Sequence, residues 1–224
     1  MNIGIPTLNK KYPRTSYWPF SPFKGRTEGI HADPSHFVGV PVVITEKLDG
    51  CNVLLHSCKV YGRSVSTPSE EKWMALVKKH HAWKITEPDI YLYGEDIYGV
   101  HSITYNAVPE NRTFYAFSLR DGTGSFSSFA KMSDYATHKN IPVVPVLFEG
   151  VFDSATEICS FVNHAHEEPS VLGGEREGIV MRLACDFAES EFPLNICKSV
   201  RPGHVKNAEH WTRNWQPCQV LASV

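Results

Sequence analysis

The chain has 224 residues, a formal net charge of −2 at pH 7, 42% apolar residues and 21% charged residues. This composition is typical of a globular protein with a sizeable core, and the length suits one large domain better than two. The nearly neutral total gives no global basic signal for nucleic acid, but it is compatible with a local basic groove. No apolar run approaches the roughly 18 to 20 residues that span a bilayer, so no membrane partner is expected.

Cysteine usage and the start of the chain bear on the compartment. The six cysteines form no C-x-x-C pair and no dense framework. This pattern favours free thiols in a reducing environment. Residues 1–11 contain no apolar run of the signal-peptide kind before their lysines. We therefore expect a cytoplasmic protein.

The first 40 residues are rich in turn formers, aromatic residues and basic residues, which predicts an extended segment that wraps a body. Strand signals begin with the β-branched run Val-Val-Ile-Thr at 42–45, and two further strands are expected at 52–56 and 59–63. Ser57 and Cys58 then form the turn of a hairpin, although neither is the preferred Gly or Asn.

A helix is expected to begin at Thr67, because Pro68 suits the first helical position and Glu70 completes a capping box. The elements expected after it are strands at 90–94, 113–119, 143–148, 177–183 and 194–198, and helices at 127–139 and from 154 onward. Strands outnumber helices, and the helices fall between groups of strands. The pattern predicts an α+β fold with largely antiparallel sheets flanked by helices.

Lys47 ends the first apolar strand and is followed by Asp49 and Gly50. Lys-x-Asp-Gly is common by chance, and its ordinary explanation is an exposed turn lysine. The functional interpretation treats the Lys47 amine as a nucleophile. Such an amine attacks phosphorus only when deprotonated, so nearby cations or desolvation must lower its pKa.

Four later segments follow Lys47 in a fixed order. Tyr-Leu-Tyr-Gly-Glu ends a strand at Glu95, and Phe-Tyr-Ala-Phe alternates aromatic residues up to Phe117. Glu-Gly-Ile-Val-Met-Arg begins a strand at Glu177, and Asn-Ile-Cys-Lys ends the last strand at Lys198. Each segment alone suits a plain sheet. The complete order is much rarer by chance.

In this order the segments resemble the covalent nucleotidyltransferases, which comprise DNA ligases, RNA ligases and mRNA capping enzymes. The likeness to ATP-dependent RNA ligases is the strongest, and it covers roughly residues 41–198. The opening Lys-Tyr-Pro-Arg-Thr at 11–15 is also similar to the lead-in of a group of small RNA ligase-like proteins. The resemblance implies one nucleotidyltransferase domain over residues 1–224, of the ATP-grasp-like ligase adenylation type. Residues 1–40 would be its extended N-terminal segment and 199–224 a short C-terminal tail, with no appended oligonucleotide-binding barrel.

The resemblance also implies a reaction. Lys47 would attack the α-phosphorus of ATP, release pyrophosphate and hold AMP through a phosphoramide bond. The AMP would pass to a 5′-phosphate RNA end, and a 3′-hydroxyl would displace it to seal the strand. Mg²⁺ or Mn²⁺ is expected at Glu177, because a carboxylate suits a hard cation. The implied ATP- and AMP-binding residues are Glu46, Lys47, Asp49, Asn52, Arg63, Glu95, Phe117, Glu177 and Lys198.

Individual roles follow from the same resemblance. Glu46 would lie near the adenine edge, and Arg63 would contact the ribose or the phosphate. Glu95 would accept hydrogen bonds from the ribose hydroxyls, since a carboxylate only accepts. Phe117 would stack on adenine, and Lys198 would grip the α-phosphate. The plain structural alternatives are core packing for Phe117 and a surface strand position for Arg63. For Glu95 and Glu177 the alternative is a solvated sheet edge.

Two positions depart from the family pattern. RNA ligases of this kind usually carry two lysines one residue apart in the last motif, and Ile196 stands in place of the first. Either Lys198 suffices, or Arg201 or Lys206 supplies the second positive charge. Ser118 follows the aromatic strand where an acidic residue is common, which leaves a metal role there open.

Three functions therefore compete. An RNA ligase acting on 5′-phosphate and 3′-hydroxyl RNA ends is favoured. A DNA ligase or a capping-type guanylyltransferase uses the same core, but the short tail leaves no room for the barrel that those enzymes append. A non-catalytic RNA- or nucleotide-binding module rests only on the Ile196 departure. No protein partner is predicted, and the identity of the RNA remains open.

Overall fold

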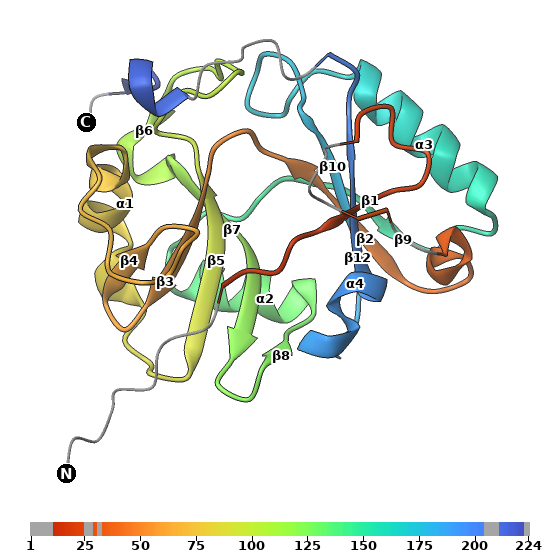
Figure 1. Ribbon diagram of the computed structural model, residues 1–224, viewed down its shortest axis with the longest axis horizontal. Helices are drawn as coiled ribbons and strands as arrows, with labels where there is room; N and C mark the ends of the chain where they lie inside the picture. Colours follow the sequence, from red (N-terminus) through yellow and green to blue (C-terminus); the bar gives the residue numbers. More distant parts are fainter. Residues whose placement is uncertain (1–10, 25–28, 31–32, 204–210, 222–224) are drawn as a thin grey trace.

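The structure is a computed structural model that describes residues 11–24, 29–30, 33–203 and 211–221. Two sheets, each covered by helices, make up most of it (Figure 1). The first sheet has the order β1 (Ser16–Tyr17), β12 (Ile196–Val200), β10 (Gly178–Leu183), β2 (Val42–Lys47) and β9 (Val146–Gly150). The second sheet has the order β11 (Phe187–Ala188), β8 (Ser125–Phe126), β7 (Phe114–Asp121), β5 (Ile90–Asp96), β3 (Cys51–His56) and β4 (Lys59–Tyr61).

Neighbouring strands of the two sheets are antiparallel, except for the parallel pair β1 and β12. A short parallel pair joins β6 (Val108–Pro109) to β13 (Val220–Leu221). The helices are α1 (Ala75–His80), α2 (Phe129–His138), α3 (Ala155–Glu167) and α4 (Phe192–Asn195). The expected α+β fold with largely antiparallel sheets is confirmed. Among the described residues, no helix is long and apolar enough to cross a bilayer.

The cores explain why these segments pair. In β2, Val42, Val43 and Ile44 are all buried, because α3 packs on one face of the first sheet and the main core of the molecule fills the other. A strand buried on both faces reads as a continuous apolar run, as this one does. Trp18 in the N-terminal segment is 1% exposed and packs into the α3 core, so this segment is part of the fold.

The helix expected from Thr67 does not begin there. Residues 67–71 are irregular, a 3-10 turn spans Lys72–Met74, and α1 follows. The Ser69 amide donates to the Val60 carbonyl at 2.8 Å, and the Ser69 hydroxyl accepts from the Glu71 amide. These tertiary and local bonds hold the segment against β4, and they outweigh the helix-capping preference of the sequence.

The other turns and caps follow the sequence more closely. Ser57 and Cys58 form the expected hairpin turn with φ values of 47° and 58°, the left-handed pair that a two-residue turn requires. The Ser128 hydroxyl caps α2 by accepting from the Lys131 amide. β9 starts three residues later than expected, because Val144 bonds to Ala116 of β7 instead.

Candidate active site

A cavity of about 800 Å³ is lined by residues of both sheets and of both terminal segments. Seven of the nine nucleotide-binding residues expected from the sequence line it: Glu46, Lys47, Asn52, Arg63, Glu95, Phe117 and Lys198. Asp49 and Glu177 are buried just beside it. The structure therefore brings the dispersed motif residues together in one place.

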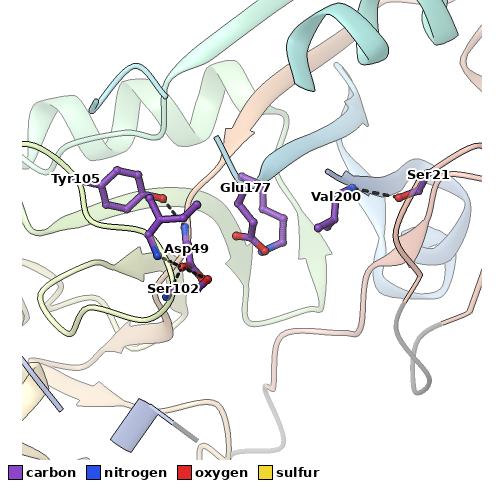
Figure 2. A network of polar contacts seen from close by, with 8 residues as sticks. Ser21, Asp49, Ser102, Tyr105, Glu177 and Val200 are labelled. Atoms are coloured by element: carbon purple, nitrogen blue, oxygen red, sulfur yellow. Dashed lines mark hydrogen bonds and ion pairs between the residues drawn. The ribbon is translucent and has the colours of Figure 1, made fainter. Parts of the chain in front are cut away.

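Lys47 occupies the end of β2, and strand register places it opposite Gly178 of β10. Glu177 comes immediately before that strand. The Lys47 Nζ donates to the Glu177 Oε1 at 2.6 Å, although the two residues are 130 positions apart in the sequence. Figure 2 shows Glu177 beside the Asp49 turn that follows Lys47. The pair brings the amine of Lys47 into direct contact with a carboxylate.

The electrostatic surroundings of Lys47 differ from the sequence-based expectation. Burial alone lowers the pKa of the amine, but the charges of Glu177, Glu95 and Asp49 outweigh burial and raise the pKa above its usual value. The expected lowering of the Lys47 pKa is therefore absent from this structure, because carboxylates dominate around the amine. The ammonium form is the stable one here.

Glu95 is the second carboxylate of this group, and it lies opposite Asn52 in the pairing of β5 with β3. Burial raises the pKa of Glu95 to about 8. The charge of Lys47 lowers this pKa, and the charges of Glu177 and Asp49 raise it further. The site thus holds more acidic groups than one lysine neutralises, and it favours an additional positive charge.

Asp49 fixes the turn after Lys47. Its Oδ2 accepts from the Ser102 amide at 2.8 Å, the Ser102 hydroxyl at 2.8 Å and the Ile103 amide at 2.9 Å. The Asp49 amide donates to the Tyr105 hydroxyl at 2.7 Å, and Figure 2 shows this network. The geometry gives the Asp49 carboxylate a positioning role behind the cavity wall. Its place as a direct nucleotide ligand stays a prediction.

Glu46 is 1% exposed, yet it lines the cavity. Its Oε2 accepts from the Val171 amide at 2.9 Å, and Arg176 Nε lies 3.8 Å from the same oxygen. The other oxygen, Oε1, has no hydrogen-bond partner among the described residues. Glu46 therefore has one anchored oxygen and one buried oxygen that no described residue satisfies, at a position in the cavity lining.

On one side of the cavity the expected Phe117 lies beside Tyr12, a residue that the sequence did not single out. Phe117 is half-buried, and the ring of Tyr12 meets it edge-on with centroids 5.1 Å apart. Val180 of β10 also lines the cavity. Lys198 places its Nζ 4.3 Å from the centroid of the Tyr17 ring. Tyr12 and Tyr17 belong to the N-terminal segment, whose β1 pairs with β12.

The C-terminal segment contributes a further wall. Trp211 and Thr212 line the cavity, and the Trp211 ring stacks on His101 with centroids 4.0 Å apart. Trp73 meets the Trp211 ring at 5.0 Å. The only sequence signal for this contribution was the aromatic character of the tail.

Three positions bear on the second positive charge expected in the last motif. Ile196 lines the cavity and is 1% exposed. Arg201 pairs with Glu175 at 2.5 Å and does not line the cavity. Lys206 lies outside the described residues.

A divalent metal fits the oxygen-rich side of the site. The described residues contain no ready-made group of three or more His, Cys, Asp or Glu side chains. Glu177 and Glu95 are nevertheless electrostatic neighbours, and the pKa of Glu95 is raised partly by the Glu177 charge. Carboxylate oxygens of this kind suit Mg²⁺ or Mn²⁺ when substrate phosphates or water complete the ligand set.

A family model described as RNA ligase matches residues 40–200. A search of curated proteins found no match.

Among solved structures, the chain is similar to an archaeal ATP-dependent RNA ligase, with a TM-score of 0.52 and 15% identity over 85% of this chain and 48% of that one. It is also similar to a Naegleria gruberi RNA ligase variant with ATP and Mn, with a TM-score of 0.59 and 15% identity over 89% and 58%. A second Naegleria gruberi variant, with AMP and Mn, gives a TM-score of 0.59 and 16% identity over 88% and 57%. The chain thus spans about half the length of these ligases, and at such identities the likeness shows the fold.

Proposed function

Because the chain belongs to the RNA ligase family, whose model matches residues 40–200, we propose that it is an ATP-dependent RNA ligase working through an AMP adduct on Lys47. The observation that carries the proposal is the Lys47 amine in the cavity wall, 2.6 Å from Glu177. Glu95, Phe117 and Lys198 line the same cavity. These groups supply a nucleophile, hydroxyl acceptors, a stacking face and a cation.

The first step is attack by the Lys47 Nζ on the α-phosphorus of ATP. The new N–P bond forms as the bond to the pyrophosphate oxygen breaks, and the amine must lose its proton before or during attack. The proton leaves to water, while Glu177, the carboxylate in direct contact with the amine, orients it for attack. AMP then passes to the 5′-phosphate of RNA, and a 3′-hydroxyl displaces AMP to form the phosphodiester bond.

The acidic group around Lys47 is suited to Mg²⁺ or Mn²⁺ through Glu177, with Glu95 close by. Bound there, the cation would neutralise phosphate charge and lower the pKa of the amine. The Glu177 charge is the strongest influence that raises the Lys47 pKa, so neutralising that charge would lower the pKa most. The chain's own part is to fix the amine, the carboxylates and the phosphate in line.

We take Glu46 as the hydrogen-bond acceptor for the amino group of adenine. Its Oε1 is an acceptor without a partner among the described residues, and adenine carries an amino donor where guanine carries a carbonyl oxygen. A guanine carbonyl facing the carboxylate would set two acceptors against each other. Phe117 and Val180 provide apolar surface for the purine. The proposal therefore takes ATP as substrate and sets a capping-type guanylyltransferase second.

Compartment, partners and domain organisation complete the proposal. All six cysteines are free thiols, which supports a reducing, cytoplasmic environment. The partners are RNA 5′-phosphate and 3′-hydroxyl ends. Both terminal segments line the cavity, which supports treating residues 1–224 as one adenylation domain.

The test is incubation with α-labelled ATP or α-labelled GTP, each with Mg²⁺ or Mn²⁺, followed by addition of RNA or DNA with 5′-phosphate ends. An adduct from ATP that passes to RNA supports the proposal. An adduct from GTP indicates the capping reaction, and sealing of DNA alone indicates a DNA ligase. Absence of any adduct with either metal favours a non-catalytic nucleotide-binding module.

A further inference from the structure

The loop that joins β5 to β6, residues 97–107, contacts the turn after Lys47. In this 97–107 loop the Ser102 amide, the Ser102 hydroxyl and the Ile103 amide all donate to the Asp49 Oδ2, at 2.8, 2.8 and 2.9 Å. The Tyr105 hydroxyl accepts from the Asp49 amide at 2.7 Å (Figure 2). Asp49 is thus held by both its carboxylate and its backbone, two residues from Lys47.

Ser102 and Tyr105 act from behind the cavity wall. Neither residue lines the cavity, and Tyr105 is 5% exposed. The turn that they hold is also packed tightly on β5, because a Cβ at Gly50 would lie 2.5 Å from the Asp96 carbonyl oxygen. Attack on phosphorus needs the amine in line with the leaving oxygen, so a small shift of this turn should slow the reaction.

The C-terminal segment, residues 211–221, holds the other side of the 97–107 loop. The Val100 amide donates to the Gln216 carbonyl at 2.9 Å, and the Cys218 amide donates to the Tyr98 carbonyl at 2.7 Å. The segment then pairs its β13 with β6, beside which it lies in Figure 1.

Two tryptophans of the C-terminal segment pack on Gly99 of this loop. A Cβ at Gly99 would lie 2.9 Å from a ring carbon of Trp211 and 2.9 Å from the Nε1 of Trp215. The Trp211 ring also stacks on His101 at 4.0 Å, and the Trp215 ring meets that of Tyr98 at 5.8 Å. Trp215, unlike Trp211, does not line the cavity. The two rings therefore cover the loop over residues 98–101.

We propose that Ser102 and Tyr105 are positioning residues for the Lys47 amine, and that the C-terminal segment is needed for attack by this amine because it holds their loop in place. The inference rests on the proposed function and deepens it, since it assigns the network to the first step, attack on ATP. Sealing of RNA that already carries AMP needs no attack by Lys47. The network therefore matters far less to that later step.

The experiment loosens the network at three points. Tyr105→Phe removes only the hydroxyl that accepts from the Asp49 amide, Ser102→Ala removes one of the three donors to the carboxylate, and Trp215→Ala removes packing on the loop from outside the cavity. Each should slow adduct formation at saturating ATP, by about 5- to 100-fold for Tyr105→Phe, because the amine is displaced. Single-turnover rates over a range of ATP concentrations should show a lower maximal rate at a nearly unchanged half-saturating concentration.

Two variants outside the network serve as controls. Tyr91→Phe matches Tyr105→Phe, because Tyr91 is 6% exposed and lies outside the cavity lining. Trp83→Ala removes an exposed tryptophan that is also outside the lining. Both should form the adduct at the wild-type rate.

Sealing of pre-adenylated RNA shows whether the effect belongs to the first step. Slow adduct formation with sealing near the wild-type rate supports the inference. Equal losses in both reactions, an unchanged adduct rate in Tyr105→Phe or Trp215→Ala, or the same losses in the controls would overturn it. Melting temperatures establish folding, and Trp215→Leu replaces Trp215→Ala in the same comparison if the latter does not fold.

The failure of the proposed function would be visible separately. If wild-type protein forms no adduct, the hold on the turn is judged by hydrogen exchange in the peptide that contains Asp49. Faster exchange there in Tyr105→Phe and Trp215→Ala than in the two controls supports the positioning role, and equal exchange overturns it.

Discussion

The amine of Lys47 and the carboxylate of Glu177 lie 2.6 Å apart across 130 positions of sequence. Their proximity is a consequence of strand register, because β2 and β10 are antiparallel and Lys47 stands opposite Gly178. The contact also explains why the pKa of Lys47 is raised despite burial. The Lys47 amine is therefore protonated until the surrounding negative charge is neutralised.

This relationship predicts a shifted pH profile for Glu177→Gln. The wild-type rate of adduct formation should rise with pH, since attack needs the neutral amine and the Lys47 pKa lies above its usual value. Removing the Glu177 charge removes the strongest influence that raises this pKa, so the midpoint should move to lower pH. Single-turnover rates from neutral to alkaline pH measure the midpoint. Glu175→Gln, outside the cavity lining, should leave it in place, and an unmoved midpoint in Glu177→Gln would contradict the account.

Because of Asp96, the free energy of unfolding should depend on pH. Burial raises its pKa to about 8, from an ordinary value of 3.8. The folded protein therefore keeps a proton that the unfolded chain has released, and stability falls as pH rises through this window. Asp96→Asn should remove that dependence and gain roughly 1 to 4 kcal/mol at about pH 8 relative to about pH 4. Urea unfolding at both pH values measures the difference.

Asp121 serves as a control, because its pKa is shifted in the opposite direction from that of Asp96. Burial acts to raise its pKa, but donors from Thr123, Ser125 and Gly124 outweigh burial and hold the pKa below its usual range. Its contribution is present at neutral pH and lost in acid, so Asp121→Asn should cost more stability near neutrality. The same pH response for both variants would refute the burial argument.

Gly178 controls the spacing of the strands that carry the site. A Cβ at this position would lie 2.1 Å from the Ser199 carbonyl oxygen, which belongs to the backbone of β12. Gly178→Ala should therefore displace β12 and Lys198, with a loss of about 1 to 3 kcal/mol in unfolding free energy and a fall in adduct formation. Gly29→Ala is the matched control, because among the described residues its Cβ would meet only the Ser16 hydroxyl, at 3.7 Å. Equal melting temperatures for the two variants would count against this prediction.

Replacing Phe117 with a residue that lacks an aromatic ring should weaken nucleotide binding. Stacking on a base is worth about 1 to 3 kcal/mol, so Phe117→Ala should raise the Kd for ATP by about 5- to 150-fold. Phe117→Trp should retain most of the affinity. Calorimetry with ATP measures both, and Phe20→Ala, an exposed aromatic outside the cavity lining, serves as control. An unchanged Kd in Phe117→Ala would leave core packing as the role of this ring.

The fold was predictable where a segment's own pattern decides its structure. The β-branched run of β2 and the serine cap of α2 both appear as expected. The helix expected from Thr67 failed, because the bond from the Ser69 amide to the Val60 carbonyl is a tertiary contact that local sequence does not encode. Strand register and sheet order likewise depend on distant partners.

The site, too, was predictable from the sequence only in part. The motif order identified seven residues that line the cavity, Lys47 among them, but it did not indicate that Asp49 would bond to Ser102 and Ile103. Tyr12 and Trp211 were also missed, because only the tertiary fold brings the two terminal segments to the cavity. A motif indicates which residues meet. It does not give the charge balance around them, which here raises the Lys47 pKa.

The most direct test of the central claim is the fate of the label from α-labelled ATP in wild-type and Lys47→Ala protein with Mg²⁺ or Mn²⁺. Label at the γ-phosphorus serves as the control, and melting temperatures establish that both proteins are folded. The account predicts that wild type retains the α label and not the γ label, on the peptide that contains Lys47, and that Lys47→Ala retains neither. Retention of the α label by folded Lys47→Ala protein, or its attachment to another residue in wild type, would contradict it.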